Sequence, residues 1–162
     1  MRINKHKMKT KIIIDLDVLT VGFWDKSKNG DYSRKFMARV NASEFFIITP
    51  TSLIELVGNW KHQTLRVKIQ EYYVNCTNEY IEKTNIIKDI ISKDIDFESL
   101  FEQFINEGIK EEDILLILVS SIKDALLVTF NRVHLRNKVL EINRILSKNG
   151  LKNIKITSPE QF

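Results

Sequence analysis

Residues 11–19 read KIIIDLDVL and carry the strongest fold signal in the chain. Three consecutive isoleucines form a short β-branched run, which is typical of a strand buried on both faces of a parallel sheet. Asp15 follows this strand directly, and Asp17 lies two residues later. Open α/β sheets bind their ligands at the carboxyl ends of the strands. Asp15 is therefore the first candidate for a functional residue.

Further apolar runs predict more strands, with helical patterns between them. The strand candidates are FFIIT at 45–49, LLVTF at 126–130 and residues 154–157. Strands that alternate with helices predict an α/β fold, here a Rossmann-like three-layer sandwich with a central parallel β-sheet. The sequence KSKNGD at 26–31 predicts a loop, because Asn-Gly is a turn signal. The predicted helical segments span 18–24 (a short helix or turn), 33–40, 53–60, 65–84, 85–92, 97–105, 112–125 and 131–147.

The bulk composition predicts one soluble domain that covers residues 1–162. A chain of 162 residues with 43% hydrophobic and 28% charged residues is long enough to bury a core. Its net charge of +4 mildly favours polyanionic partners. The single cysteine, Cys76, excludes an internal disulfide and favours a cytoplasmic location. No apolar run approaches the length of a membrane span, and Asp15 interrupts the run that follows the basic lead-in at 1–10, which argues against a signal peptide.

The predicted helix at 112–125 is the most informative one. Its residues 114–119 are apolar on every side, which predicts burial. Asp113, Ser120 and Asp124 nevertheless fall on one narrow stripe, at about 100° per residue. A polar stripe on a buried helix needs a reason inside the protein, so Asp113 becomes the second candidate.

Three carboxylates are predicted near the ends of strands and helices. Asp15 ends a strand, Glu55 lies in a helix that follows a strand, and Asp113 begins a helix that leads into one. Carboxylates that converge in one cleft bind a hard divalent cation such as Mg²⁺ or Mn²⁺. Such a site activates a water and stabilises a phosphate during hydrolysis. Each acid also has a simpler interpretation: Asp15 caps the next helix, Glu55 is a solvated surface residue, and Asp113 complements the helix dipole.

Three motifs resemble the PIN-domain ribonucleases, a family that includes the VapC-type toxins. They are IIIDLDVL at 12–19, TPTSLIELVGNW at 49–60 and EEDILLILVSSIKDALLVTFNRVHL at 111–135, and the resemblance extends to about Pro159. The resemblance implies a Rossmann-like parallel sheet and acids that gather in one groove. It also implies Mg²⁺ or Mn²⁺ as the cofactor and cleavage of single-stranded RNA as the activity.

The same resemblance implies a role for each candidate residue. Asp15 and Asp113 would be metal ligands. Glu55 would be a further ligand or would hold the metal-bound water. Thr129 and Asn131 would orient an acid and the water.

The sequence departs from the family pattern after the third strand. Many members have an aspartate where Asn131 stands, or a further one where His134 stands. Asp17, at a position that is usually Asn or Ser, would partly compensate for the missing charge. The basic residues Arg132, His134 and Arg136 are predicted to contact RNA phosphates, and a solvated positive face is the alternative.

RNA is the predicted partner of a protein of this kind. A toxin would also pair with an antitoxin protein whose apolar segment covers the groove. We further expect a homodimer and no membrane partner. The aromatic residues Phe23, Trp24, Tyr72 and Tyr73 are candidates for either protein contact, and a place in the core explains them equally well.

Two alternatives stay open. The pair Asp15 and Asp17 resembles the nucleophile motif of haloacid-dehalogenase-like phosphatases, but Leu19 stands where those enzymes need threonine. LLVTFNR also supplies Asn131 and no acid after the late strand. The stronger alternative is a catalytically weakened PIN-like module that binds RNA or a protein. Full loss of activity would normally remove Asp15 or Asp113, and both are present.

Overall fold

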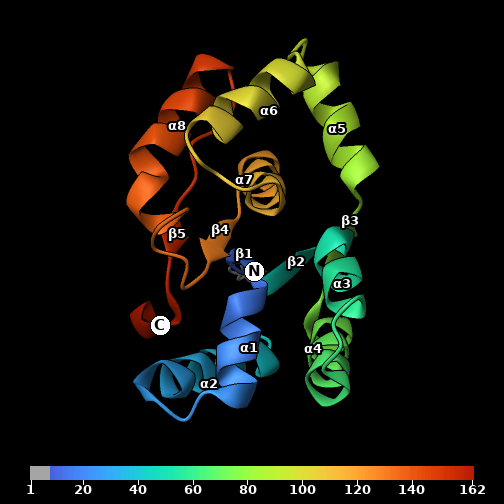
Figure 1. Ribbon diagram of the computed structural model, residues 1–162, viewed down its shortest axis with the longest axis vertical. Helices are drawn as coiled ribbons and strands as arrows, with labels where there is room; N and C mark the ends of the chain where they lie inside the picture. Colours follow the sequence, from blue (N-terminus) through green and yellow to red (C-terminus); the bar gives the residue numbers. More distant parts are fainter. Residues whose placement is uncertain (1–7) are drawn as a thin grey trace, which may run out of the picture.

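The computed structural model describes residues 8–162, so most of the basic lead-in at 1–10 lies outside the described residues. Its centre is a five-stranded sheet with the strand order β3-β2-β1-β4-β5 (Figure 1). All neighbouring strands pair in parallel. The predicted α/β fold, a three-layer Rossmann-like sandwich, is confirmed. The strands are β1 Lys11–Ile14, β2 Phe46–Pro50, β3 Glu79–Ile81, β4 Leu126–Val128 and β5 Ile156–Thr157.

Helices cover both faces of the sheet, because each connection between parallel strands must cross back over one face. In Figure 1 the helices α1 to α4 lie below the sheet and the helices α5 to α8 lie above it. The lower helices are α1 Leu16–Trp24, α2 Lys28–Asn41, α3 Thr51–Gly58 and α4 Gln63–Cys76. The upper helices are α5 Lys83–Ser92, α6 Phe97–Asn106, α7 Glu111–Lys123 and α8 Val139–Lys148.

The order of the strands reverses between β1 and β4. The chain adds β2 and β3 on one side of β1, and it adds β4 and β5 on the other side. The register places Ile12 beside Ile47 on one flank and Ile14 beside Val128 on the other. A reversal of this kind leaves a crevice outside the carboxyl ends of the two central strands, where open α/β sheets bind their ligands.

Helix α7 lies against the central strands and is covered by the other upper helices. It contacts β1, β2 and β4 on one side and α5 and α6 on the other, and Figure 1 shows it enclosed by α5, α6 and α8. Residues 114–119 are all buried, which confirms the predicted burial. Of the polar stripe, Asp113 and Ser120 are buried, and the Ser120 hydroxyl donates to the Ala125 carbonyl. Asp124 instead caps the helix in the left-handed region (φ 53°) and pairs with Lys152 at the surface.

The predicted helix at 65–84 is wrong for residues 77–82. Helix α4 ends at Cys76, and the chain then forms the edge strand β3 beside β2. The Asn78 side chain accepts a hydrogen bond from the Ile47 amide at 2.8 Å, and the hydroxyls of Thr77 and Thr49 lie 2.7 Å apart. These contacts across the sheet outweigh the local helical pattern, and a strand of three residues is too short to produce a pattern of its own.

Two other predicted boundaries differ from the structure. The predicted loop at 26–31 is confirmed for Lys26 and Ser27 and wrong from Lys28 on, because Asn29 and Gly30 lie in the first turn of α2. Glycine is needed there for close packing, since a Cβ on Gly30 would stand 1.9 Å from the Asp25 carbonyl oxygen. The predicted helix at 131–147 begins only at Val139, after a turn and a short 3-10 segment at Arg136–Lys138.

Two of the four aromatic candidates for a protein contact belong to the core. The buried Tyr73 hydroxyl donates to the Ile14 carbonyl at 2.8 Å, and the Tyr72 hydroxyl donates to the Met37 carbonyl at 3.0 Å. Phe23 is half-buried against Tyr72, with ring centroids 6.0 Å apart. Trp24 stays at the surface with 65% of its area exposed.

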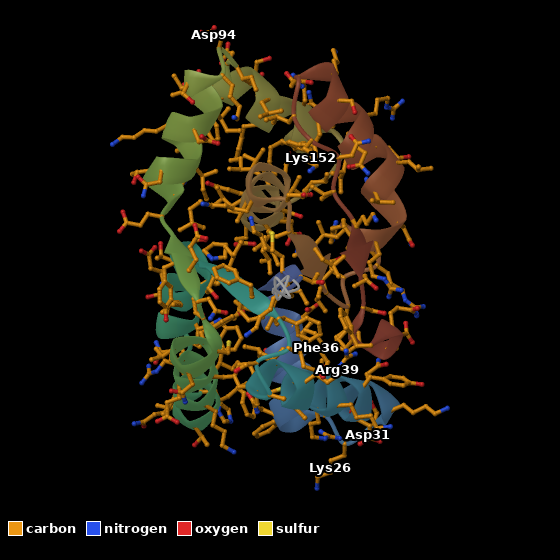
Figure 2. The ribbon with its side chains drawn as sticks, turned by 180° about the vertical axis from the view of Figure 1, so that it is seen from behind. Lys26, Asp31, Phe36, Arg39, Asp94 and Lys152 are labelled. Atoms are coloured by element: carbon orange, nitrogen blue, oxygen red, sulfur yellow. The ribbon has the colours of Figure 1, made fainter. Side chains whose placement is uncertain are left out.

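The carboxyl terminus docks onto α2. Phe162 packs on Phe36 with ring centroids 4.7 Å apart, and the Arg39 guanidinium lies 5.9 Å from the Phe162 ring. In Figure 2, Lys26 and Asp31 lie at the outer boundary of this region, while Phe36 and Arg39 lie further in. Within residues 8–162, no helix is both long and apolar enough to cross a membrane.

Candidate active site

A cavity of about 540 Å³ opens where β1 and β4 end. Helices α1, α3 and α7 supply its walls, and the chain just after β4 supplies its edge. Four carboxylates and one lysine line it, together with an apolar wall. The polar lining residues are Asp15, Asp17, Thr20, Lys110, Glu112, Asp113 and Asn131, and the apolar ones are Leu16, Val21, Leu53, Leu56, Trp60 and Leu116.

Asp15 is positioned by the end of β1 and the start of α1. Its amide donates to the Val128 carbonyl at 3.0 Å, so the residue still belongs to the pairing of β1 with β4. Its Oδ1 caps α1 by accepting from the Leu16 amide at 2.7 Å. Its Oδ2 accepts from the Thr129 hydroxyl at 2.8 Å. The capping interpretation of Asp15 is therefore confirmed, and a direct link to β4 accompanies it.

Thr129 connects three residues of the site. Its Oγ1 accepts from the Asn131 amide at 3.0 Å and lies 3.2 Å from Asp17 Oδ2. A hydroxyl has one proton, so it cannot donate to Asp15 and to an ionised Asp17 at the same time. A protonated Asp17 removes the conflict, because it can donate to Thr129 while Thr129 donates to Asp15. The Phe130 amide also donates to Asp17 Oδ2 at 3.1 Å.

Asp113 enters the cavity from the first turn of α7. Only 8% of the residue is exposed, and its Oδ2 accepts from the Asn131 side-chain amide at 3.4 Å. The carbonyl oxygen of the Asn131 side chain accepts from the His134 amide at 3.0 Å. These two bonds fix the orientation of the Asn131 side chain and direct its NH₂ group at Asp113. A neutral residue therefore connects the end of β4 to the start of α7.

Burial and crowding raise the pKa values of the buried acids. Burial raises the pKa of Asp113 to about 7, and the charges of Asp15 and Glu112 add to the effect. Burial likewise raises the pKa of Asp17 to about 7, with a further contribution from Asp15. The pKa of Asp15 is also raised by burial, while the hydrogen bonds from Thr129 and Leu16 oppose the shift. The cavity therefore favours either protons or a cation among its carboxylates.

The metal-free protein is expected to lose stability as the pH rises from 5 to 7. Over this range a raised pKa keeps Asp17 protonated in the folded state while it ionises in the unfolded state, so folding is favoured at low pH and this advantage is lost towards pH 7. One such group changes the free energy of unfolding by roughly 2 kcal/mol over two pH units.

Thermal unfolding in the presence of a chelator measures this effect. Asp17→Asn keeps the shape and an acceptor oxygen, and it should reduce the pH dependence relative to the wild type. Asp94→Asn is the matched control, since Asp94 is exposed and lies at the far end of the molecule in Figure 2. An unchanged pH dependence in Asp17→Asn would mean that Asp17 does not hold the extra proton.

The structure does not bring Glu55 to the cavity. Leu53 and Val57 of α3 pack into the core, which turns Leu56 and Trp60 towards the cavity. At about 100° per residue, Glu55 then lies on the opposite side of the helix, where it is exposed. The simpler interpretation of Glu55 agrees with this placement, and the role implied by the resemblance does not.

The predicted basic residues lie near the site but do not line the cavity. Arg132 is exposed in the turn after β4. His134 is half-buried, and its backbone amide is the group that contacts Asn131. Arg136 is half-buried and lies 3.7 Å from Glu160. Of the three, Arg132 is the one most accessible to a phosphate.

Sequence reasoning missed two charged residues of the cavity. Lys110 and Glu112 flank the first turn of α7 and line the cavity beside Asp113. Both stand next to a predicted site residue in the sequence, which was the available signal. Glu112 therefore adds a carboxylate to the cavity from the same helix turn as Asp113, whereas Glu55 of α3 adds none.

The donors of the cavity fit a magnesium-like ion that keeps most of its water. Within residues 8–162, no three His, Cys, Asp or Glu side chains are grouped closely enough to hold one metal together. Mg²⁺ does not need such a group, because it is usually bound by one or two carboxylates and several waters. Asp15 and Asp113 supply two carboxylates on opposite walls, and a cation between them would relieve the crowding that raises their pKa values.

No protein-family model and no curated protein matches the chain.

Proposed function

We propose that the protein is a divalent-metal-dependent endoribonuclease that hydrolyses phosphodiester bonds of single-stranded RNA, as the resemblance to PIN-domain ribonucleases implies. One observation supports this proposal above the others. Asp15 and Asp113, which are far apart in sequence, line one cavity at the switch point of a parallel sheet. Thr129 and Asn131, the other two residues that the resemblance selects, hydrogen-bond to these carboxylates.

Asp15 and Asp113 would hold Mg²⁺ or Mn²⁺. When bound, such an ion supplies Lewis-acid stabilisation of the phosphate and lowers the pKa of a coordinated water. Thr129 keeps Asp15 in place from β4, and Asn131 keeps Asp113 in place from the turn after β4. Asp17 holds the Phe130 amide and so fixes the backbone between them.

The remaining charged residues have roles that their positions suggest. Glu112 lines the cavity and is suited to accept a proton from the attacking water. Lys110 lines the same cavity and offers a positive charge to a phosphate oxygen. Arg132 is exposed after β4 and would contact a phosphate further along the strand.

The test is cleavage of a mixed single-stranded RNA pool with Mg²⁺, with Mn²⁺ and with EDTA. We expect cleavage with either metal and none with EDTA. A second readout does not depend on activity. Because a metal binds only the folded site, Mn²⁺ at 100 times its Kd should raise the free energy of unfolding by about 2.7 kcal/mol. The absence of both cleavage and stabilisation by the metal would contradict the proposal.

A weakened module that binds RNA or a protein is the second candidate. It is supported by Asn131, which adds no charge, and by the lack of a three-acid group within residues 8–162. Metal-induced stabilisation and RNA binding without any cleavage would favour it. A cytoplasmic location, an antitoxin partner and a homodimer remain proposals that follow from the same resemblance and from the single cysteine.

A further inference from the structure

Two aromatic rings lie near the cavity and have no part in the chemistry described above. Trp24 is 65% exposed, although it ends the helix whose first turn holds Asp17. Its ring meets that of His62 edge to face, with the centroids 4.9 Å apart and the planes at 81°. Both residues are exposed, so the paired rings are accessible from solvent.

One face of α1 leads from the carboxylates to this pair. Asp17, Thr20 and Val21 line the cavity. Trp24 follows Asp17 by seven residues, so at about 100° per residue it lies on the same face of the helix. The rise of an α-helix places it roughly 10 Å further along the axis. The lining face of α1 therefore continues beyond the acids to an exposed indole.

The connection between α3 and α4 contributes the other two rings. Trp60 lines the cavity, and His62 follows two residues later as the N-cap of α4. The Arg66 guanidinium donates to the Trp60 carbonyl at 3.2 Å and so ties this connection to α4. Lys61, which lies between Trp60 and His62 in the sequence, is exposed, and Lys110 lines the cavity from α7. Positive charge thus accompanies the aromatic groups.

We infer that Trp24 and His62, with Trp60 beside them, form a stacking site for one unpaired base of the strand whose phosphate lies at Asp15 and Asp113. This inference rests on the proposed ribonuclease function. Single-stranded RNA is recognised through splayed bases that stack on aromatic rings, with cationic side chains along the backbone. The basic residues favour a polyanionic strand over an apolar protein segment as the occupant. A base at Trp24 would fix the direction of the strand relative to the acids.

Binding of two probes to uncleaving protein tests the inference. The probes are a labelled oligoadenylate of about 12 nucleotides and an abasic ribose-phosphate strand of the same length, measured by fluorescence anisotropy. The protein carries Asp113→Asn to prevent cleavage. Adding Trp24→Ala should weaken oligoadenylate binding by about 5- to 100-fold and leave binding of the abasic strand unchanged. Trp24→Phe should restore most of the affinity for oligoadenylate.

The control is Tyr80→Ala, which removes an exposed aromatic ring on β3 outside the cavity lining and should change neither affinity. Equal weakening of both probes by Trp24→Ala, or weakening of neither, would overturn the inference. Failure of the ribonuclease proposal is measured separately, as the absence of metal-dependent cleavage by the wild type, so the two failures are distinguishable.

Discussion

Asp113→Asn is expected to reduce metal-dependent RNA cleavage by about 10²- to 10³-fold, a typical loss when a group that stabilises the reacting charge is removed. The variant should nevertheless fold, and at pH 8 it should be more stable than the metal-free wild type. Burial and the nearby charges of Asp15 and Glu112 raise the pKa of Asp113 to about 7. Above that pH the folded protein therefore carries a buried negative charge that destabilises it. Asparagine removes that charge, which should add about 1–2 kcal/mol to the free energy of unfolding.

The two readouts together separate a catalytic acid from a structural one. Initial cleavage rates are compared at saturating Mn²⁺, and unfolding is followed by circular dichroism in EDTA. A structural role for Asp113 would make the variant both less active and less stable. Full activity in Asp113→Asn would contradict the assignment of the site.

Glu55→Gln is the matched control for this experiment. It makes the same acid-to-amide change on α3, at a position where the side chain is exposed and outside the cavity lining. We expect cleavage within about twofold of the wild type, because surface substitutions of this kind have small effects. A loss comparable to that of Asp113→Asn would mean that Glu55 acts as the resemblance implies.

Thr129→Val is expected to have the second-largest effect. Thr129 is fully buried, and its hydroxyl donates to Asp15 and accepts from the Asn131 amide. Valine keeps the shape but leaves both partners without this bond, which should cost about 1–3 kcal/mol of stability. Because Asp15 and the turn that carries Asn131 lose their alignment, cleavage and metal affinity should fall by about 10- to 100-fold.

Thr129→Ser supplies the control for that loss. Serine restores the hydroxyl and removes only a methyl group, so cleavage and Mn²⁺ affinity should return to near the wild-type values. A Ser variant as impaired as the Val variant would assign the effect to packing rather than to the hydrogen bond. Mn²⁺ titration followed by thermal unfolding gives the affinity without relying on activity.

Local sequence patterns were sufficient for the layers of this fold. The apolar runs near 12, 46 and 126 are mostly buried strands, the run near 156 is a half-buried strand, and residues 114–119 are a buried helix. These predictions succeeded because burial on both faces leaves a composition that cannot be mistaken for a surface. The shared placement of Asp15 and Asp113 followed from similar reasoning, since a helix that leads into a parallel strand begins at the edge of the sheet where the strands end.

Other features depend on contacts between distant segments, and local pattern could not reveal them. Strand β3 exists because Asn78 and the backbone of β2 provide partners at the sheet edge. Glu55 faces solvent because the core fixes the rotation of α3 through Leu53 and Val57, and a helix of unknown rotation cannot be assigned a facing side. The raised pKa values of Asp17 and Asp113 arise from burial beside other acids. The residue types of the site are thus written locally, whereas their protonation, orientation and partners arise only when segments more than a hundred residues apart meet, as Asp15 and Thr129 do.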